Sequence, residues 1–318
     1  MSTGSSQARR LWATLALTVA CSLWGATFLF AKMALTELPV SQVLLYRFLL
    51  AAFVFLILLA RCKRVVRVRD IPLFLLSGFL TVPVTFLLQF TGLSLTNVTS
   101  AALIIGTVPP LIALAAICFL RERFTLWNWS AAALSLLGLI LLVWWPGAGT
   151  QWVGDGFVFL SVLAVVGWTL INTYLARSYA AFDITAYTLL SGTLFLIPIS
   201  LWWDGPPHVH VSVSVWLALL ALGLLCTVIT FALWNWAIQV VGASRAGVYL
   251  NLEPLVGALL GVVVMRDPFG IHQLFGGLLV ITAAIMVSWP RKMHSEPNKN
   301  EQLVVVPLDR VNGKEDRE

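Results

Sequence analysis

The residues of this sequence most able to do chemistry centre on one carboxylate in an apolar run. The run is "VYLNLEPLVGALLG", Val248–Gly261, and it carries Asn251, Glu253 and Pro254 within four positions. An ionised carboxylate in apolar surroundings is costly unless it is paired, hydrogen-bonded or wet. Glu253 therefore predicts either a water-lined cavity or a permanently buried ion pair.

Other polar and aromatic side chains lie equally deep in apolar runs. Arg47 and Gln89 are two of them, and Trp24 and Trp168 lie well inside their own runs. Asn172 follows Trp168 by four residues, so the two share one helix face. A pocket that combines a guanidinium, a carboxylate, an amide and indole faces suits a zwitterion with an apolar or aromatic side chain. For each tryptophan taken singly, core packing is an equally supported interpretation.

Helical spacing places further residues on the face of Glu253. The stripe recurs every four residues and comprises Arg245, Tyr249, Glu253, Gly257 and Gly261. Arg245 and Arg47 are the candidate partners of Glu253 if its role is only structural. The two glycines predict close helix packing rather than oligomerisation.

Two prolines predict interrupted helices. Pro254 has no backbone N–H, and its ring clashes with the carbonyl of Leu250, so we expect a kink and a free acceptor at that turn. Pro109 predicts the same kink in an earlier apolar run. In lipid a free acceptor must be satisfied by protein or by cavity water, so both kinks favour a cavity.

The elements that position these residues are membrane helices. Of the 318 residues, 59% are hydrophobic and 11% are charged, whereas soluble domains carry about 25% charged residues. A helix needs roughly 20 apolar residues to cross a bilayer core. Ten segments meet that length: Leu11–Lys32, Val40–Ala60, Ile71–Leu93, Thr99–Leu120, Leu126–Trp145, Val153–Leu175, Asp183–Trp203, Val213–Val240, Ala243–Met265 and Ile271–Trp289.

The basic residues predict the orientation. If the N-terminus is cytoplasmic, only Lys32 and Arg266 fall on the outer side. The inner loops and flanks then hold thirteen: Arg9, Arg10, Arg61, Lys63, Arg64, Arg67, Arg69, Arg121, Arg123, Arg177, Arg245, Arg291 and Lys292. This positive-inside asymmetry predicts that both termini are cytoplasmic. The net charge of +6 is therefore interpreted as a topology signal that contacts lipid, not as a nucleic-acid site.

The chain contains an internal repeat. A shift of 145 residues lays "SAALIIGTVPPLIALAAICFLRERF" over "RAGVYLNLEPLVGALLGVVVMRDPF" and carries Pro109 onto Pro254. A shift of 144 carries Trp24 onto Trp168. Each helix moves forward by five, an odd number, so the two halves must cross the membrane in opposite directions. Two inverted five-helix halves are typical of transporters with a site near the midplane.

The sequence resembles the EamA family of the drug/metabolite transporter superfamily. The first half carries the likeness through "CSLWGATFLFAKMAL" and "YRFLLAAFVF", and the second through "FALWNWAIQVVGASRAGVYLNLEPLVGALLG". The resemblance covers Leu11–Trp289, and it departs from the family at Asp267, where a glutamate is usual. It implies ten helices, cytoplasmic termini and export of amino acids or other small metabolites; some relatives carry drugs, nucleotide sugars or sugar phosphates.

We therefore expect an all-α integral membrane protein with ten transmembrane helices in two inverted five-helix repeats (5+5). Residues 1–10 would form a cytoplasmic tail, 11–145 the first repeat, 146–290 the second, and 291–318 a disordered cytoplasmic tail. The expected location is the bacterial plasma (inner) membrane.

The expected function is secondary active export of small metabolites, most favourably apolar or aromatic amino acids. Efflux of drugs or hydrophobic cations is the alternative, which the positive charge of Arg47 disfavours, and a membrane-embedded enzyme ranks last because no catalytic motif occurs in the spans. We expect no cofactor, no metal site and no nucleic acid; the partners are a small-molecule substrate and lipid. Proton coupling and oligomeric state stay open.

The topology can be tested with reporter fusions. An alkaline-phosphatase or fluorescent reporter joined after Trp289 should report a cytoplasmic C-terminus, because ten spans return the chain to its starting side. The same reporters joined after Gly205, between two predicted spans, are the matched control and should report the outer side. External activity after Trp289 would contradict the ten-span topology.

Overall fold

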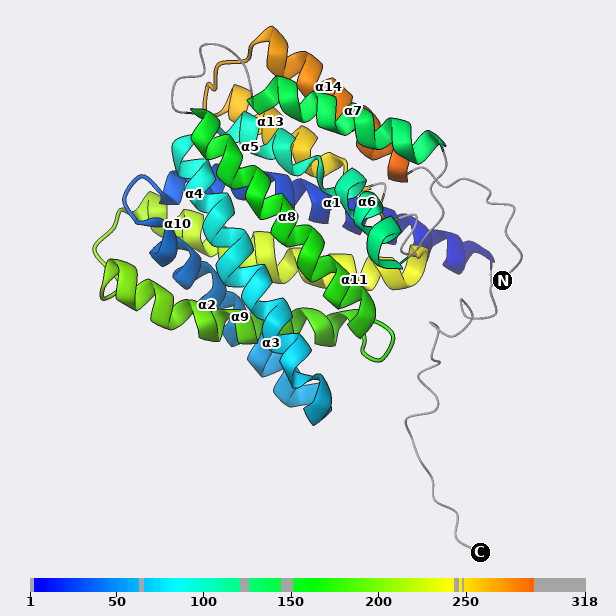
Figure 1. Cartoon of the computed structure of the whole chain (residues 1–318). Helices are drawn as coiled ribbons and strands as arrows, with labels where there is room; N and C mark the ends of the chain where they lie inside the picture. Colours follow the sequence, from blue (N-terminus) through cyan, green and yellow to red (C-terminus); the bar gives the residue numbers. More distant parts are fainter. Residues whose placement is uncertain are drawn as a thin grey trace, which may run out of the picture.

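The structure is a computed structural model, and it describes residues 3–62, 66–120, 126–143, 151–242, 246–247 and 249–288. Within these residues the regular structure is entirely helical (Figure 1). The helices are α1 (Thr3–Ala34), α2 (Val40–Cys62), η1 (Val68–Asp70), α3 (Ile71–Phe79), η2 (Leu80–Phe86), α4 (Leu87–Leu95), α5 (Val98–Ile105), α6 (Val108–Leu120), α7 (Leu126–Val143), α8 (Gln151–Leu175), α9 (Ala181–Asp204), α10 (Val213–Leu220), η3 (Ala221–Ile229), α11 (Thr230–Val241), α13 (Leu252–Val263) and α14 (Ile271–Ser288).

The helices account for the ten predicted spans. Among the described residues, six helical stretches are long and apolar enough to cross a membrane, and four shorter apolar helices take the remaining positions. The protein is therefore an all-helical, multi-pass membrane protein. The first helix is longer than expected, since it begins at Thr3 and includes most of the predicted tail 1–10. The predicted tail 291–318 lies outside the described residues.

The third and eighth spans each contain a π-helical segment that the sequence did not predict. In η2 the Thr85 hydroxyl donates to the carbonyl of Leu80 at 2.8 Å, and at the end of η3 the hydroxyl of Thr230, the first residue of α11, donates to the carbonyl of Leu225 at 2.7 Å. Each bond reaches back five residues, which is the spacing of a π-turn. A shift of 145 residues carries Thr85 onto Thr230, so the two halves share the same irregularity.

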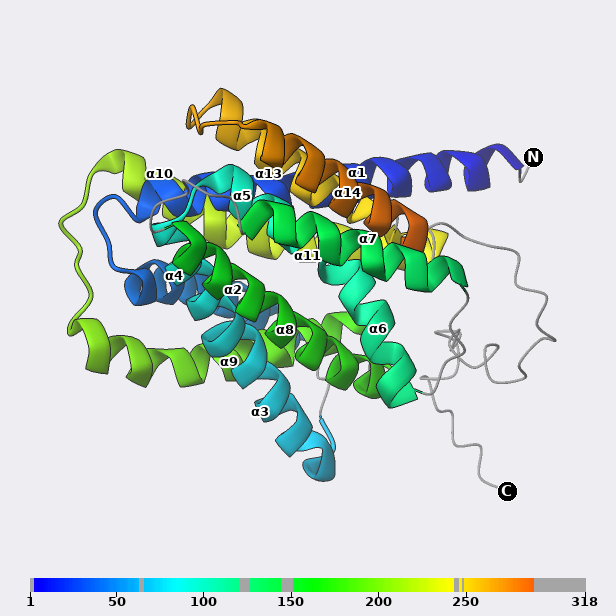
Figure 2. The ribbon, with the colours of Figure 1, turned by 45° about the horizontal axis from the view of Figure 1, so that its top comes forward.

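The halves interlock through their first helices. α1 packs on α11 and α13 of the second half, and α8 packs on α4, α5 and α6 of the first. The last helices of the halves, α7 and α14, lie side by side in both views (Figures 1 and 2). This reciprocal arrangement is what two repeats of opposite direction produce, and it places residues of both halves at the centre of the bundle.

Glycines at corresponding positions permit close helix contacts. A Cβ atom added to Gly78 would lie 2.7 Å from the carbonyl oxygen of Thr188 on α9. A Cβ atom on Gly223 would lie 3.2 Å from the carbonyl oxygen of Arg47 on α2. Because α2 and α9 are the second helices of the two halves, these contacts repeat as well. Gly78 and Gly223 therefore set how closely the π-helical spans approach their neighbours.

Polar side chains close the predicted outer end around the turn between α4 and α5. Lys32 of α1 donates to the carbonyls of Leu93 and Thr96, each at 2.6 Å. Asp267 accepts from the backbone N–H of Thr99 at 2.9 Å and from its hydroxyl at 3.0 Å. A cation at a helix C-terminus and an anion at a helix N-terminus both match the helix dipole. Asp267, where the family resemblance would place Glu, thus caps α5.

A second acid and a surface connection add to this closure. Asp155 of α8 is buried and accepts from the Thr96 hydroxyl at 2.7 Å. Glu37, in the turn before α2, accepts from the hydroxyl of Ser212 and, at 2.7 Å, from its backbone N–H. These bonds stabilise the carboxylate and hold the pKa of Glu37 below its ordinary value. Both contacts join residues of the first half to residues of the second.

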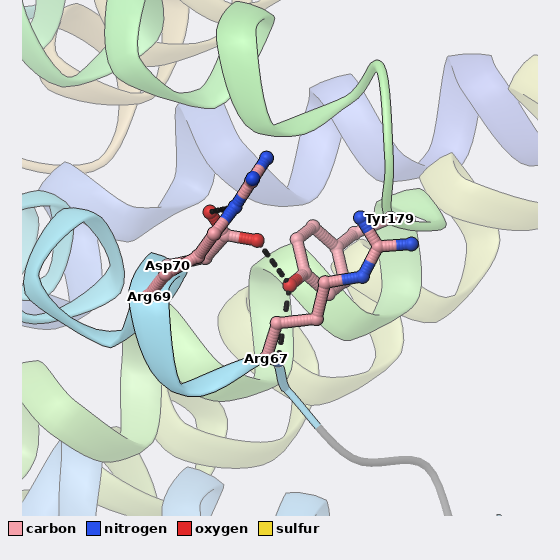
Figure 3. A network of polar contacts seen from close by, with 4 residues as sticks. All are labelled: Arg67, Arg69, Asp70 and Tyr179. Atoms are coloured by element: carbon pink, nitrogen blue, oxygen red, sulfur yellow. Dashed lines mark hydrogen bonds and ion pairs between the residues drawn. The ribbon is translucent and has the colours of Figure 1, made fainter.

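The predicted cytoplasmic end has its own contact between the halves, shown in Figure 3. Tyr179, in the turn between α8 and α9, donates its hydroxyl proton to Asp70 at 2.7 Å and accepts from the backbone N–H of Arg67 at 3.1 Å. Arg69 forms an exposed ion pair with Asp70 at 3.5 Å. These bonds attach the start of α3 to the second half.

The glycine contacts predict opposite effects for two similar substitutions. Gly78→Ala should destabilise the protein by about 1 to 3 kcal/mol, because the new methyl group meets backbone atoms of α9. Gly156→Ala is the control, because a Cβ atom there meets nothing within 4 Å; it should gain up to about 1 kcal/mol from helix propensity. Thermal unfolding in detergent would measure both, and equal melting temperatures would contradict the packing account.

Candidate functional site

Arg47 is the largest fully buried side chain in the described part of the chain, with 2% of its surface exposed. It lies on α2, and its Nε donates to the hydroxyl of Thr227 in η3 at 3.0 Å. Its Nη1 is buried and has no hydrogen-bond partner among the described residues. A buried donor left unsatisfied costs about 1 to 3 kcal/mol, and more when it is charged. The site is therefore short of an acceptor at this nitrogen.

Three phenylalanine rings surround the guanidinium. Its central carbon lies 5.1 Å from the ring centre of Phe48, 4.7 Å from that of Phe86 and 5.7 Å from that of Phe90. Each is a cation–π distance, and such contacts strengthen when water is excluded. The rings stabilise the positive charge without supplying a counter-ion, so the charge stays available to an anionic group.

Glu253 lies in the first turn of α13 and is half-buried. Its charge and that of Arg47 influence one another, yet the two side chains form no ion pair within 4.0 Å. The interpretation of Glu253 as a permanent structural partner of Arg47 is therefore wrong for this structure. Arg245, the other partner considered, lies outside the described residues.

The prolines begin the second parts of two broken helices rather than kink continuous ones. The chain turns at residues 106–107 between α5 and α6, so Pro109 falls in the first turn of α6. It turns again at residues 250–251 before α13, so Pro254 falls in that helix's first turn, where a missing N–H costs little. The expected free acceptor is wrong, because the Leu250 carbonyl accepts from the N–H of Glu253 at 3.1 Å.

The same break divides the predicted stripe. Glu253, Gly257 and Gly261 share one helix, but Tyr249 precedes the turn. Tyr249 is half-buried and packs on a cluster that includes Ala13, Leu17 and Ala237. The glycines pack as expected, since a Cβ atom on Gly257 would lie 2.5 Å from Ala102 of α5.

Two further predicted site residues, Trp24 and Gln89, are buried or packed among aromatic residues. Trp24 packs on Phe231 and Trp234 of α11, with ring centres 5.5 and 5.3 Å apart. Gln89 is buried on α4 between Phe86 and Phe90 in sequence, both of which contact Arg47.

Trp168 and Asn172 of α8 are both half-buried, and they differ in their polar contacts. The Trp168 Nε1 is buried without a partner in the described chain. Asn172 accepts from the hydroxyl of Ser77 at 2.7 Å through its Oδ1. Neither residue contacts Arg47 or Glu253 through a hydrogen bond or ion pair, so the structure gathers the aromatic rings around Arg47 but leaves Trp168 and Asn172 separate from it.

Sequence reasoning missed Thr227 and the three phenylalanines that hold Arg47. Phe86 and Phe90 are four residues apart, so their shared face was readable from spacing. Thr227 gave no signal, because its approach depends on the π-helical turn. Among the described residues, no three His, Cys, Asp or Glu side chains gather closely enough to hold a metal ion.

A membrane protein whose repeated halves interlock around two opposite charges that form no ion pair within the described part of the chain belongs to the class of inverted-repeat membrane transporters. More specifically, the chain belongs to the EamA-like transporter family, which matches residues 11–144 and 152–289. It is thus a membrane transporter and not an enzyme.

Relatives occur in bacteria and archaea. The uncharacterized transporter YyaM of Bacillus subtilis is 25% identical over 273 residues, which cover 83% of this chain and 89% of YyaM. An uncharacterized transporter of Archaeoglobus fulgidus is 25% identical over 283 residues, covering 86% and 96%. The uncharacterized inner membrane transporter YicL of Salmonella typhimurium is 26% identical over 219 residues, covering 68% and 71%.

A solved structure shares the fold. A crystal structure that is 20% identical superposes with a TM-score of 0.61 and covers 86% of this chain and 96% of its own. At this identity the likeness supports the arrangement of helices alone.

Trp168 and Asn172 can be tested as substrate-binding residues. Trp168→Ala or Asn172→Ala should change the order of preference among transported solutes more than the amount of protein in the membrane, if their polar atoms face the transport path. Trp202→Ala is the control, because Trp202 is 84% exposed at the end of α9. Parallel loss of protein and transport would identify Trp168 and Asn172 as packing residues. The measurements are immunoblots and uptake competition in everted vesicles.

Proposed function

We propose that this transporter is a secondary active exporter of small metabolites, and that apolar or aromatic amino acids are its substrates. The observation that carries the proposal is that Arg47 and Glu253 form no ion pair with each other or with another described residue. The first has a buried nitrogen without an acceptor among the described residues, and the second is a half-buried carboxylate. A zwitterion would satisfy both groups at once.

The chemistry of the two groups favours an α-amino acid. Guanidinium groups bind carboxylates through parallel N–H bonds, and a carboxylate accepts hydrogen bonds from an ammonium group. A zwitterion bound between the two groups would interact with Arg47 through its carboxylate and with Glu253 through its ammonium group. These two interactions would offset the cost of removing the zwitterion from water. A phosphorylated substrate would need several basic residues, and Arg47 is the only Lys or Arg deep in a predicted span.

The aromatic residues favour an apolar or aromatic side chain. Phe86 and Phe90 lie beside the guanidinium, and Trp24 contacts Phe231 edge-on and Trp234 at a tilt, both on α11. Edge-to-face and offset contacts with such rings contribute about 0.5 to 1.5 kcal/mol per aromatic pair beyond area burial. Efflux of hydrophobic cations is the alternative, but the positive charge of Arg47 opposes it.

Alternating access gives the transport cycle. Arg47 belongs to the first half and Glu253 to the second, so a substrate bound to both would follow the movement of one half against the other. The contacts of Asp155 and Asp267 join the halves at the predicted outer end, so they would have to separate for release to that side.

Glu253 also offers a route for proton coupling. A proton and a substrate ammonium group would compete for the same carboxylate, so entry of a proton from outside would drive release of the substrate there. Export of amino acid would then be coupled to inward proton movement across the plasma membrane.

Glu253→Gln tests this role. The amide keeps the shape and removes the charge, so transport and its dependence on the proton gradient should be lost. Folding should be nearly intact, because Glu253 forms no ion pair with any described residue. Glu37→Gln is the control, since this acid lies outside the spans and should leave the pH dependence of transport unchanged.

Three measurements on the same preparations decide the outcome: membrane abundance, thermal stability and pH-dependent transport of labelled amino acids. Normal transport with unchanged pH dependence by a stable Glu253→Gln protein would refute the role in binding. Poor expression would instead indicate a structural partner, because breaking a buried ion pair typically costs 3 to 5 kcal/mol.

A further inference from the structure

The Arg47 guanidinium touches both π-helical segments. Its Nε donates to Thr227, which lies in η3 of the second half, and its central carbon lies 4.7 Å from the ring centre of Phe86, the last residue of η2 in the first half. Arg47 itself lies on α2 of the first half. One side chain therefore connects three spans at the centre of the bundle, and Thr227 is its one hydrogen-bond partner among the described residues.

The π-turn sets the direction in which Thr227 accepts. A hydroxyl group has one proton and two lone pairs. The Thr227 proton goes to the carbonyl of Leu222, five residues back, at 2.8 Å. The lone pairs are then left for the Arg47 Nε at 3.0 Å. Because Thr227 is fully buried, water does not compete for them.

Fixing Nε also fixes the rest of the guanidinium. The group is planar, so one hydrogen bond at Nε together with ring faces on Phe48 and Phe86 restrains both its position and its tilt. The terminal nitrogens keep their binding capacity, and Nη1 has no partner among the described residues. A carboxylate is the ligand that matches this planar pair of donors.

We infer that Thr227 is the positioning residue of the transport site, which orients Arg47 so that its terminal nitrogens select substrates bearing a carboxylate. The inference rests on the proposed function and adds the residue on which carboxylate selectivity depends. Thr227 does not touch the substrate. It acts through Arg47, and the bond links substrate recognition in the first half to the π-helical segment of the second.

Thr230, three residues after Thr227, offers a matched control. Thr230 donates to the carbonyl of Leu225 at 2.7 Å, a bond of the same kind as that of Thr227 to Leu222, but no arginine bonds to it. Thr227→Val and Thr230→Val therefore lose equivalent internal bonds. Only the first also removes the acceptor of Arg47. Thr227→Ser keeps the hydroxyl and should rescue.

The test uses the purified full-length protein in proteoliposomes with three probes. L-phenylalanine carries both charges, phenethylamine lacks the carboxylate, and 3-phenylpropionate lacks the ammonium group. Initial rates give KM and kcat for each transported probe, and thermal shifts give binding. Wild-type protein should bind phenylalanine best and lose most of that preference when the carboxylate is absent.

Thr227→Val should raise the KM for phenylalanine and weaken binding of 3-phenylpropionate by about tenfold to a hundredfold, the range for losing a hydrogen bond to a charged group. Phenethylamine binding and kcat should change little. Thr227→Ser should return to within about threefold of wild type, and Thr230→Val should keep wild-type selectivity with a comparable loss of thermal stability.

Two outcomes overturn the inference in distinguishable ways. If wild-type protein binds phenylalanine selectively but Thr227→Val weakens all three probes equally, or Thr227→Ser fails to rescue, Thr227 is only structural and the proposed function stands. If wild-type protein neither binds nor transports any of the three probes, while other labelled solutes are carried, the amino-acid function fails and the role of Thr227 fails with it.

Discussion

The arrangement of the centre follows from one constraint, a buried guanidinium with no counter-ion among the described residues. Moving an ion from water into an apolar interior is so costly that the protein must supply substitutes for hydration. Here a threonine hydroxyl and three aromatic faces supply part of that substitution, and one nitrogen is left without an acceptor among the described residues. The helices around Arg47 are therefore arranged to stabilise the charge incompletely, which is the condition under which an anionic group binds.

The scaffold is nearly symmetric, whereas the site is not. The shift that pairs Thr85 with Thr230 places Val82 opposite Thr227 and Val108 opposite Glu253. The duplicated helices thus carry the polar groups in one copy and apolar residues in the other. For the zwitterionic substrate proposed above, one orientation would then be favoured at the interface of the halves, because the mirror-related positions of Thr227 and Glu253 are occupied by valines.

The sequence predicts the scaffold and the two charges but not their surroundings. Arg47 and Glu253 stand out because the cost of burying a charge depends on residue type and depth, and both can be read from an apolar run. The repeat follows from the matched prolines Pro109 and Pro254. Tyr249 was misplaced and Thr227 was missed for a common reason, since the spacing argument assumes 3.6 residues per turn and fails across a helix break or a π-turn. Those departures depend on tertiary packing.

The turn between α4 and α5 is held largely by hydrogen bonds to its backbone groups. Lys32 holds two carbonyl oxygens and Asp267 holds an amide N–H, and every non-proline residue offers those same groups. The side chains of the turn can therefore change with little effect on that fastening, whereas Lys32 and Asp267 have no such freedom. Among homologues we expect the residues of the turn to vary in sequence, while position 32 stays basic and position 267 stays acidic. Sequence conservation at this end would then fall on the two side chains that bind the turn and not on the turn itself.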